Sequence, residues 1–445
     1  MTVAGNLQEI VEEALRTHGV PGASVAVFAE GELACAQAGV LNIETGVPVT
    51  PDTLFQIGSI AKAYTATAIM HLAERGELDL DAPLSRYLPE LILADGPPAD
   101  GVTVRRVLSH TSGLDGDYFL DTGEGNDCLA RYVFACAALP MIARPGDYIS
   151  YSNAGYVLLG RVIERLAGAL WEDAMRSLIL DPLGADHTLL YPEDTPRFRA
   201  AIGHFSKGGT LKVSETAFMD RSGGPAGARM MASATDLVAF ARIHLDGGAA
   251  LLRPDSVAAM QEPQAPFPYY DFASHWGLGW MLFDYGGERL VGHDGSAMGQ
   301  CATLRFSPRH NLAIAAATNS EDGKPFLKSV CATVLQSVAG IPAPDSAMPD
   351  ESHQAPADLE SYVGRYRNIG ATLDVAATPS GLRATHVMDG FSRALFDVFE
   401  YDFKPMGEDR FRDAAQSTDL VFLSPDADGR PHYAHAGARL FKRSA

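Results

Sequence analysis

The pattern of apolar and polar positions divides the first 340 residues into strands at both ends and helices between them. Short alternating or apolar runs bounded by turn residues predict strands, and apolar residues three or four apart predict helices. The predicted strands are residues 23–28, 32–39, 277–283, 289–291, 300–306 and 312–318. The predicted helices are residues 1–18, 59–75, 102–108, 128–139, 154–167, 171–180, 233–245 and 326–338. This order predicts an α+β fold, with one sheet assembled from both ends of the segment.

The C-terminal part of the chain has a different pattern. Residues 341–358 contain four prolines among Asp, Glu and Ser and have no apolar periodicity, which predicts a linker. Beyond it, short strands are predicted at residues 362–366, 372–375, 382–386, 396–403, 409–412, 420–423 and 439–442. Such a series predicts a small antiparallel β-barrel or β-sandwich, of which we expect the barrel. We therefore expect a first domain at residues 1–340, a linker at residues 341–358 and a barrel domain at residues 359–445.

The net charge limits the classes of partner, and the cysteines and the N-terminal segment indicate the cellular compartment. The formal net charge of −20 argues against nucleic acid and anionic membrane surfaces as partners. The five cysteines are scattered and form no C-x-x-C pair, so neither a disulfide framework nor a metal site is indicated. The acidic N-terminal helix does not resemble a secretion signal, and no apolar run is long enough to span a bilayer. We therefore expect a cytoplasmic protein without a membrane partner.

Ser59 and Lys62 stand at the start of a largely apolar predicted helix. Residues three apart share a helix face, so the Lys62 amine can reach the Ser59 hydroxyl. Unpaired backbone N–H groups at the helix N-terminus favour an oxyanion that develops beside Ser59. The pair therefore predicts a nucleophile and its base, although a Ser-x-x-Lys pattern also arises by chance in a chain of this length.

Two later clusters supply further candidate groups. Tyr151 and Asn153 lie in a turn before a predicted helix, where a phenol can exchange a proton and an amide can hold a carbonyl. His293 lies at the end of a predicted strand, and Gly295 lets a substrate approach the backbone closely. We expect these two clusters to converge with Ser59 on one cleft.

This ordered set of motifs resembles the serine β-lactamase and penicillin-binding-protein superfamily, especially the branch with class C β-lactamases, D-aminopeptidases and esterases. The resemblance covers about residues 20–340. It is carried by Ser59-Ile60-Ala61-Lys62, Tyr151-Ser152-Asn153, His293-Asp294-Gly295, residues 108–114 and residues 181–184. It implies a β-lactamase/transpeptidase-like fold, with a five-stranded antiparallel sheet flanked by helices and Ser59 between this sheet and a helical subdomain. Residues 359–445 resemble the lipocalin-like barrel that follows this core in many relatives.

The resemblance also implies a mechanism. Ser59 attacks a carbonyl to form an acyl-enzyme, and the backbone N–H groups of Ser59 and, by the resemblance, Ser296 hold the oxyanion. Either a neutral Lys62 or an ionised Tyr151 takes the proton, and the sequence leaves this choice open. No cofactor and no metal are implied.

Asn153, Gly295 and His293 are expected to act on the substrate side of the site. Asn153 would orient both Lys62 and the substrate amide, and Gly295 would leave room for the substrate beside the backbone. His293 would hydrogen-bond the Tyr151 oxygen or the acyl group of the substrate.

The chain departs from the family pattern at one motif. The β-lactamases and D-alanyl carboxypeptidases usually have Lys-Thr-Gly or Lys-Ser-Gly where this chain has His293-Asp294-Gly295, and losing the lysine weakens capture of a free carboxylate. The chain also lacks Glu-x-x-Leu-Asn, so class A deacylation is not supported. A β-lactamase function is therefore a weaker expectation than chemistry on other amides and esters.

Three functions remain open. The first is a serine peptidase, amidase or esterase that acts on small peptides or esters. The second is a penicillin-binding-type thioesterase or acyltransferase that releases or cyclises nonribosomal peptides, with a thioester substrate and a carrier protein as partner. A barrel that shields the acyl-enzyme from water would favour the second, whereas the negative charge fits poorly with an acidic carrier unless a patch around Arg197 and Arg199 receives it. The third is a penicillin-binding sensor, against which the lack of a membrane segment counts.

Two residues near the C-terminus have structural expectations. His435 and His432 lack a third ligand, so they are expected to be polar groups of the barrel rather than metal ligands. Arg439 would reach the cleft only if the barrel folds over it, and we expect a structural role for it.

Overall fold

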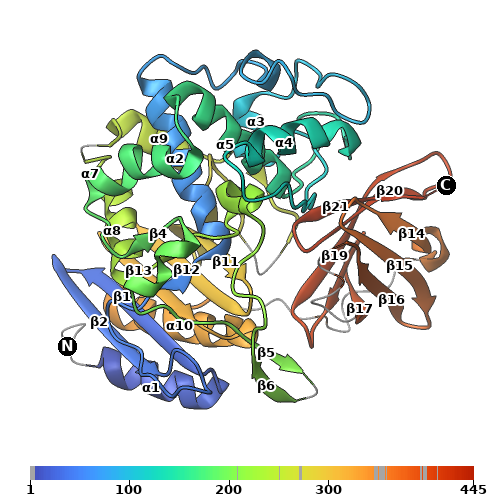
Figure 1. Cartoon of the computed structure of the whole chain (residues 1–445). Coiled ribbons are helices and arrows are strands. Elements are labelled where there is room, and N and C mark those ends of the chain that lie inside the picture. The colour runs from blue at the N-terminus through green and yellow to red at the C-terminus, as the bar shows by residue number, and fades with distance from the viewer. Residues whose placement is uncertain are drawn as a thin grey trace.

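The computed structural model describes residues 6–207, 209–249, 251–269, 273–344, 349, 356, 358–390, 393, 398–407 and 409–444. It consists of a main body, in which helices surround a sheet, and a separate β-barrel towards the C-terminus (Figure 1). The predicted α+β fold and the predicted barrel are both confirmed. Most of the predicted linker at residues 341–358 lies outside the described residues.

An eight-stranded antiparallel sheet forms the centre of the main body, in the order β2-β1-β13-β12-β11-β10-β9-β8. Its strands are β1 (Gly22–Ala29), β2 (Glu32–Gly39), β8 (Ala265–Pro266), β9 (His275–Trp276), β10 (Met281–Tyr285), β11 (Glu288–Ala297), β12 (Gln300–Ser307) and β13 (Leu312–Thr318). The family resemblance implied five strands. The sheet has more because β10 and the two-residue strands β9 and β8 continue it beyond β11.

Alternate residues of β1 enter two different cores. Val25 and Val27 pack with α1 (Leu7–His18) and α10 (Lys324–Ala339) on one face of the sheet. Ala26 and Phe28 pack with α2 (Ala61–Glu74) and α8 (Ala234–Leu245) on the other face. Because successive residues of a strand point to opposite faces, an apolar strand of this kind is covered on both sides.

Helix α5 (Asn153–Ala167) joins α2 to the outer helices of the body. It packs against α2 and against α3 (Val104–Leu108), α4 (Cys128–Ala135) and α6 (Trp171–Met175). The body also contains α7 (Asp181–Leu183) and α9 (Pro254–Gln261), neither of which was predicted as a helix. Also unpredicted are the sheet of β3 (Phe55–Gln56), β7 (Met231–Ala232) and β4 (Thr188–Leu189), and the hairpin of β5 (His204–Lys207) and β6 (Thr210–Val213).

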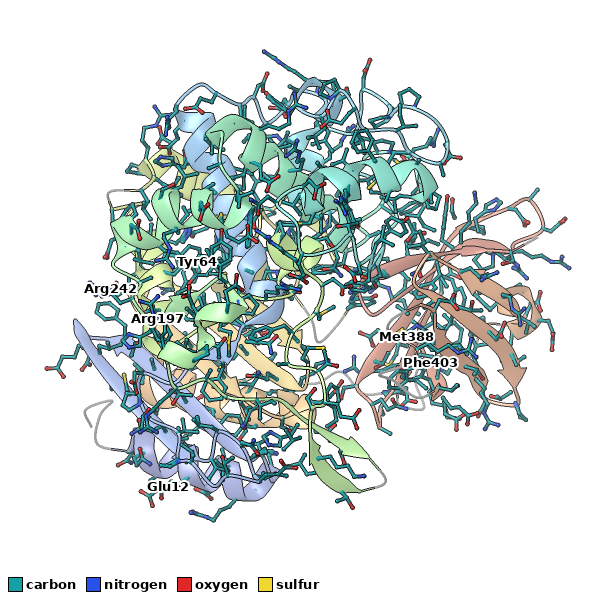
Figure 2. The ribbon with its side chains drawn as sticks, in the orientation of Figure 1. Glu12, Tyr64, Arg197, Arg242, Met388 and Phe403 are labelled. Carbon is teal, nitrogen blue, oxygen red and sulfur yellow. The ribbon has the colours of Figure 1, made fainter. Side chains whose placement is uncertain are left out.

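The C-terminal barrel is closed, and its strands pair in chain order from β14 to β21. They are β14 (Gly364–Arg367), β15 (Ala371–Thr378), β16 (Gly381–Met388), β17 (Phe399–Gly407), β18 (Arg410–Asp413), β19 (Thr418–Pro425), β20 (Pro431–Ala436) and β21 (Arg439–Arg443). Phe403 lies inside this barrel (Figure 2), where it packs in one cluster with Tyr366 and Phe422. The prediction missed β20, so it had seven strands instead of eight.

The barrel docks on the main body through β20, β21 and the turn between β14 and β15. The Ile369 backbone N–H donates a hydrogen bond to Asp115 Oδ2 at 2.8 Å. The Leu440 N–H donates to Ser150 Oγ at 3.1 Å, and its side chain packs with Ile142. These contacts place strand β21 beside the segment that carries Tyr151.

Candidate active site

Ser59 and Lys62 lie one helical turn apart, as their spacing predicts. Ser59 belongs to the short helix η2 (Gly58–Ile60), which leads directly into α2. Lys62 is fully buried, and its Nζ donates hydrogen bonds to Ser59 Oγ at 3.0 Å and to the Ala226 carbonyl oxygen at 2.5 Å. These two acceptors fix the amine beside the hydroxyl.

The last part of β11 faces the Ser59 turn with an edge that no strand of the described chain covers. Strand β10 pairs with β11 only as far as Gly292, whereas β12 pairs with residues 291–297 of β11. Beyond Gly292, the segment that contacts β11 on its other side is η2. Backbone groups of an unpaired edge are available to other partners, so this edge is suited to an oxyanion site.

Two glycines let this edge approach the Ser59 turn. A Cβ atom on Gly295 would lie 1.8 Å from the Ile57 carbonyl oxygen, and one on Gly58 would lie 2.4 Å from the Ser296 amide nitrogen. The backbone amides of Ser59 and Ser296 are therefore close neighbours. We expected Gly295 to leave room for the substrate, but the space beside it is filled by the protein's own backbone.

The phenol of Tyr151 reaches Ser59 from the segment before α5. The Tyr151 phenol lies near the Ser59 side chain, which opposes the rise of the phenol pKa on burial, and Lys62 Nζ lies 4.8 Å from the centre of the ring. The His110 ring stacks on the phenol with 4.3 Å between centroids, and His110 Nδ1 accepts a hydrogen bond from the Ser152 amide at 3.0 Å. The structure thus brings together the three side chains that the sequence proposed as one unit.

Asn153 hydrogen-bonds Asp117 instead of Lys62, whose partners among the described residues are Ser59 and Ala226. Its Nδ2 donates to Asp117 Oδ1 at 2.7 Å. The expectation that Asn153 orients Lys62 directly is therefore not met within the described part of the chain. The reason is that the loop before α4 brings a carboxylate to the Asn153 amide.

Arg439 of the barrel enters the site through the same carboxylate. Its Nε donates to Asp117 Oδ2 at 2.8 Å, and its Nη2 donates to Asp117 Oδ1 at 3.3 Å. Its Cζ atom lies 4.8 Å from the centre of the Tyr151 ring. A turn of the barrel reaches the Tyr151 side of the site, so Arg439 has a place in the site in addition to the structural role that we expected.

His293 is buried at the β11 edge. Its Nδ1 donates to the Asp294 carbonyl oxygen at 2.6 Å, while its Nε2 has no hydrogen-bond partner among the described groups. The His293 and Tyr151 rings are 6.5 Å apart between centroids. The expected hydrogen bond to the Tyr151 oxygen is therefore not made in the part of the chain described, and Nε2 stays an unused acceptor.

Burial separates the proton affinities of the two candidate bases. Burial and the positive charge of Arg439 lower the pKa of Lys62 well below its ordinary value. Burial raises the pKa of Tyr151 above its ordinary value. A neutral amine is therefore easier to reach than an ionised phenol, which favours Lys62 as the base. Burial also lowers the pKa of His293 to about 3, so its imidazole is neutral at pH 7.

The sequence analysis missed two residues of the site. His110 lies within the motif of residues 108–114, but its contact with Tyr151 gave no signal of its own. Asp117 lies in a loop rich in Gly and Asp, where one carboxylate does not stand out from its neighbours.

Within the ranges that the structure describes, no three His, Cys, Asp or Glu side chains are grouped so that they could hold a metal ion. No helix in the described part of the chain is long and apolar enough to cross a membrane.

Sequence comparisons place the chain in a known family. A family model described as Beta-lactamase matches residues 7–330. Penicillin-binding protein 4 of Amycolatopsis lactamdurans is 41% identical over 368 residues, which cover 80% of this chain and 96% of that protein. The range of the family model includes every candidate site residue of the main body.

Solved structures extend the likeness to the barrel. The crystal structure of SurE matches with a TM-score of 0.81 at 30% identity and covers 99% of both chains, and the structure of SurE with D-Leu matches with a TM-score of 0.78. The D-amino acid amidase of Ochrobactrum anthropi, complexed with D-phenylalanine, matches with a TM-score of 0.63 at 26% identity. That match covers 98% of the amidase chain and 76% of this one, so about a quarter of this chain has no counterpart in the amidase.

Proposed function

Because this chain belongs to the beta-lactamase family, we propose that it is a serine acyltransferase that forms an acyl-enzyme on Ser59 and passes the acyl group to an amine. The donor is a small peptide ester or thioester. The acceptor is the N-terminal amine of the same peptide or of a second one. The hydrogen bond between buried Lys62 and half-buried Ser59 and the relatives in this family support the acyl-enzyme.

One observation carries the choice of an amine over water, namely the barrel turn that covers the Tyr151 side of the site. The Tyr151 backbone N–H donates to the Ala438 carbonyl oxygen at 2.8 Å. Arg439, the next residue, lies against the Tyr151 ring. Protein atoms therefore occupy space next to the Tyr151 phenol, which would otherwise be open to water. Exclusion of water favours attack on the acyl-enzyme by a bound amine.

The first step loads the acyl group onto Ser59. Neutral Lys62 accepts the Ser59 proton as Oγ bonds to the donor carbonyl carbon, and the backbone N–H groups of Ser59 and Ser296 hold the oxyanion. The Tyr151 phenol gives its proton to the departing alcohol or thiol and regains one from the Lys62 ammonium. The amine is then neutral again, and the acyl group is bonded to Oγ.

The second step returns the enzyme to its starting state. The acceptor nitrogen bonds to the acyl carbon, its proton passes to Lys62, and Ser59 leaves as a hydroxyl that takes this proton back. Neutral His293 accepts a hydrogen bond at Nε2 from a substrate N–H. Asn153 gives one of its two amide protons to Asp117 and keeps the other for a substrate carbonyl.

The acylated residue is expected to have the D configuration. SurE is solved with D-Leu, and the amidase is named a D-amino acid amidase, although it is solved with L-phenylalanine as well as with D-phenylalanine; each protein shares the fold of the main body. A carrier protein is not needed for a small donor. Arg197, in the basic patch that the sequence suggested for a carrier, lies on the side of the main body away from the barrel and pairs with Asp194 at 3.1 Å (Figure 2).

The test uses two linear peptide thioesters of a small thiol that differ only in the chirality of the C-terminal residue. We expect the D epimer to be consumed at least about tenfold faster, and the main product to be cyclic or captured by an added amine. Chromatography with mass detection separates these products from the free acid. Free acid as the main product at every amine concentration would contradict the proposal.

A D-residue amidase or esterase is the second candidate. It is favoured by the match to the D-amino acid amidase, which lacks a counterpart for about a quarter of this chain. Water would then attack the same acyl-enzyme. The free-acid outcome of the thioester experiment would support this candidate, and a penicillin adduct that persists for hours would support the sensor.

A further inference from the structure

We propose that Arg439 and Asp117 are a pair of positioning residues for the Ser59 site, and that the barrel takes part in the reaction because it supplies Arg439. The inference rests on the proposed function, since it takes Lys62 to be the base in acylation. It goes beyond that function by giving the barrel a direct electrostatic part in the first chemical step.

The charges of Arg439 and Lys62 act on each other across the Tyr151 ring. Lys62 Nζ and Arg439 Cζ each lie 4.8 Å from the ring centre, so the two cations are within about 10 Å of each other. A nearby cation disfavours a charged amine, and Arg439 accordingly lowers the pKa of Lys62. Asp117 has the opposite effect, because its carboxylate favours the charged form of Lys62.

Four other titratable side chains lie near Lys62 within the described residues, and all four are uncharged at neutral pH. Burial lowers the pKa of His110 well below its ordinary value and that of His293 to about 3, so both imidazoles are neutral. Burial raises the pKa of Tyr151 and of Tyr156, so both phenols keep their protons. The balance between Arg439 and Asp117 therefore sets how readily Lys62 loses its proton.

The same pair holds Asn153 in place. Asp117 accepts hydrogen bonds from both Asn153 and Arg439, and Arg439 Nη1 also donates to the Gly437 carbonyl oxygen at 2.8 Å. The guanidinium is thus fixed at both ends, and its fork orients the carboxylate. Replacing either member should disturb Asn153 as well as Lys62.

A chain of hydrogen bonds seats the turn that carries Arg439. His435 Nε2 donates to a backbone carbonyl at 2.9 Å, so its Nδ1 accepts from the Tyr269 hydroxyl at 2.5 Å. Tyr269 in turn accepts from the Ala438 N–H at 2.9 Å, and the Ala438 carbonyl accepts from Tyr151. The main body therefore grips the β20–β21 turn through Tyr269 and through the backbone of Tyr151.

The conformation of this turn needs such support. Gly437 and Ala438 have φ values of 55° and 65°, as in a two-residue type I′ hairpin turn. Positive φ is unfavourable for alanine, and the hydrogen bonds to Ala438 offset that cost. Loss of the Tyr269 hydroxyl should loosen the turn and so weaken the effect of Arg439.

The experiment measures acylation alone, by stopped-flow release of p-nitrophenol from a p-nitrophenyl ester, as a function of pH. The variants are Arg439→Gln, Arg439→Lys, Asp117→Asn and Tyr269→Phe. Arg383→Gln is the matched control, because Arg383 pairs with Asp402 on the exposed surface of the barrel. Intact-protein mass spectrometry on each sample confirms that the adduct is on Ser59.

The acylation rate should fall at low pH, where Lys62 becomes protonated, and this falling part of the pH–rate profile is its acid limb. We expect the two members of the pair to shift the midpoint of the acid limb in opposite directions. Arg439→Gln should move it upward by about half to one pH unit, and Asp117→Asn should move it downward. Arg439→Lys should keep the acid limb at its wild-type position because the charge is retained. Tyr269→Phe should shift the limb upward by less than Arg439→Gln does. The control, Arg383→Gln, should leave the limb unchanged.

Two results have different meanings. If Arg439→Gln and Asp117→Asn slow acylation with an unmoved limb, or move it in the same direction, the inference is overturned and the proposed function stands. If the wild type shows no p-nitrophenol burst and no adduct on Ser59, the proposed function itself fails.

Discussion

Lys62 is a fully buried amine held between a hydroxyl and a carbonyl oxygen. Burial without a direct carboxylate partner is the usual way for a protein to stabilise a neutral lysine. Tyr151, buried against the same amine, is shifted in the opposite direction. Two groups with similar ordinary pKa values are thus separated by their surroundings into a base and an acid.

Lys62→Arg keeps the positive charge but cannot lose a proton at any accessible pH. We expect the acylation rate to fall by about 10² to 10⁴, the range attributed to a general base. Stopped-flow measurement with a p-nitrophenyl ester gives the rate, and circular dichroism checks the fold. Lys404→Arg is a matched control, since Lys404 also donates to a serine, Ser380, but on the barrel surface. A Lys62→Arg variant as fast as this control would contradict the assignment.

At the scale of elements, the site is the place where an unpaired strand edge meets a helix start. Strand β10 stops short, so the end of β11 is free to contact η2. The close approach depends on backbone atoms at Gly58 and Gly295 rather than on side chains. The oxyanion site is therefore sensitive to small changes of volume between these two elements.

Gly295→Ala should damage this contact, because its new Cβ would lie 1.8 Å from the Ile57 carbonyl oxygen. We expect the acylation rate to fall about 10²-fold or more, as on loss of an oxyanion donor. Ser296→Ala is the control on the next residue, because it keeps the backbone N–H and should change the rate by less than about threefold. Equal losses in both variants would show that the Ser296 side chain matters instead.

The whole molecule joins a β-lactamase-like body to a barrel through buried polar contacts. His435 is fully buried at this junction, and Asp115 receives the Ile369 N–H from the barrel. Burial lowers the pKa of His435 to about 4 and raises the pKa of Asp115 to about 6. The two groups therefore respond in opposite ways to acid.

The signs of these two effects follow from linkage. The folded protein binds a proton at His435 less readily than the unfolded chain does. Acid therefore lowers the free energy of unfolding: the contribution of neutral His435 is fully present above about pH 6.5 and is lost as pH falls towards 4. Asp115 adds stability as pH falls through 6, because its folded pKa is raised. At pH 5, His435 alone should cost about 2 kcal/mol of the free energy of unfolding.

Urea unfolding at pH 7.5 and pH 5 measures this cost. His435→Gln cannot be protonated, so its free energy of unfolding should fall by about 2 kcal/mol less than that of the wild type between the two pH values. Asp115 contributes equally to both proteins and cancels in the comparison. If the free energy of unfolding decreases by the same amount in both proteins, protonation of His435 does not contribute to the loss of stability at pH 5.

Patterns within one segment of the sequence predicted the elements and contacts that form within that segment. Strand β1 is apolar enough to show burial on both faces, and the Ser59–Lys62 contact follows from helix geometry alone. The strands β8 and β9 have two residues each, too few to show any alternation. Strand β20 begins with Pro431 and does not alternate, since both Ala434 and His435 are buried.

The contacts between distant segments could not be read from such patterns. Tyr151 and His293 stood out from the sequence only as polar groups in a turn and at a strand end, and the resemblance to a known family assigned their roles. The Arg439–Asp117 pair joins residues 322 positions apart and exists only once the barrel is docked. The sequence singled out Gly295 as a position that leaves space for the substrate. In the structure, the Ile57 carbonyl oxygen occupies that space. Docking of whole domains depends on surfaces, which periodicity within one element does not describe.

The most direct test of the central claim is intact-protein mass spectrometry of the wild type and Ser59→Ala after mixing with the D-configured peptide thioester. The account predicts that the wild type gains the mass of the acyl group within one turnover, and that peptide mapping places it on Ser59. It also predicts that added amine removes this mass as an amide product. An acyl adduct of equal extent on Ser59→Ala, or turnover of the thioester by that variant at the wild-type rate, would contradict the account.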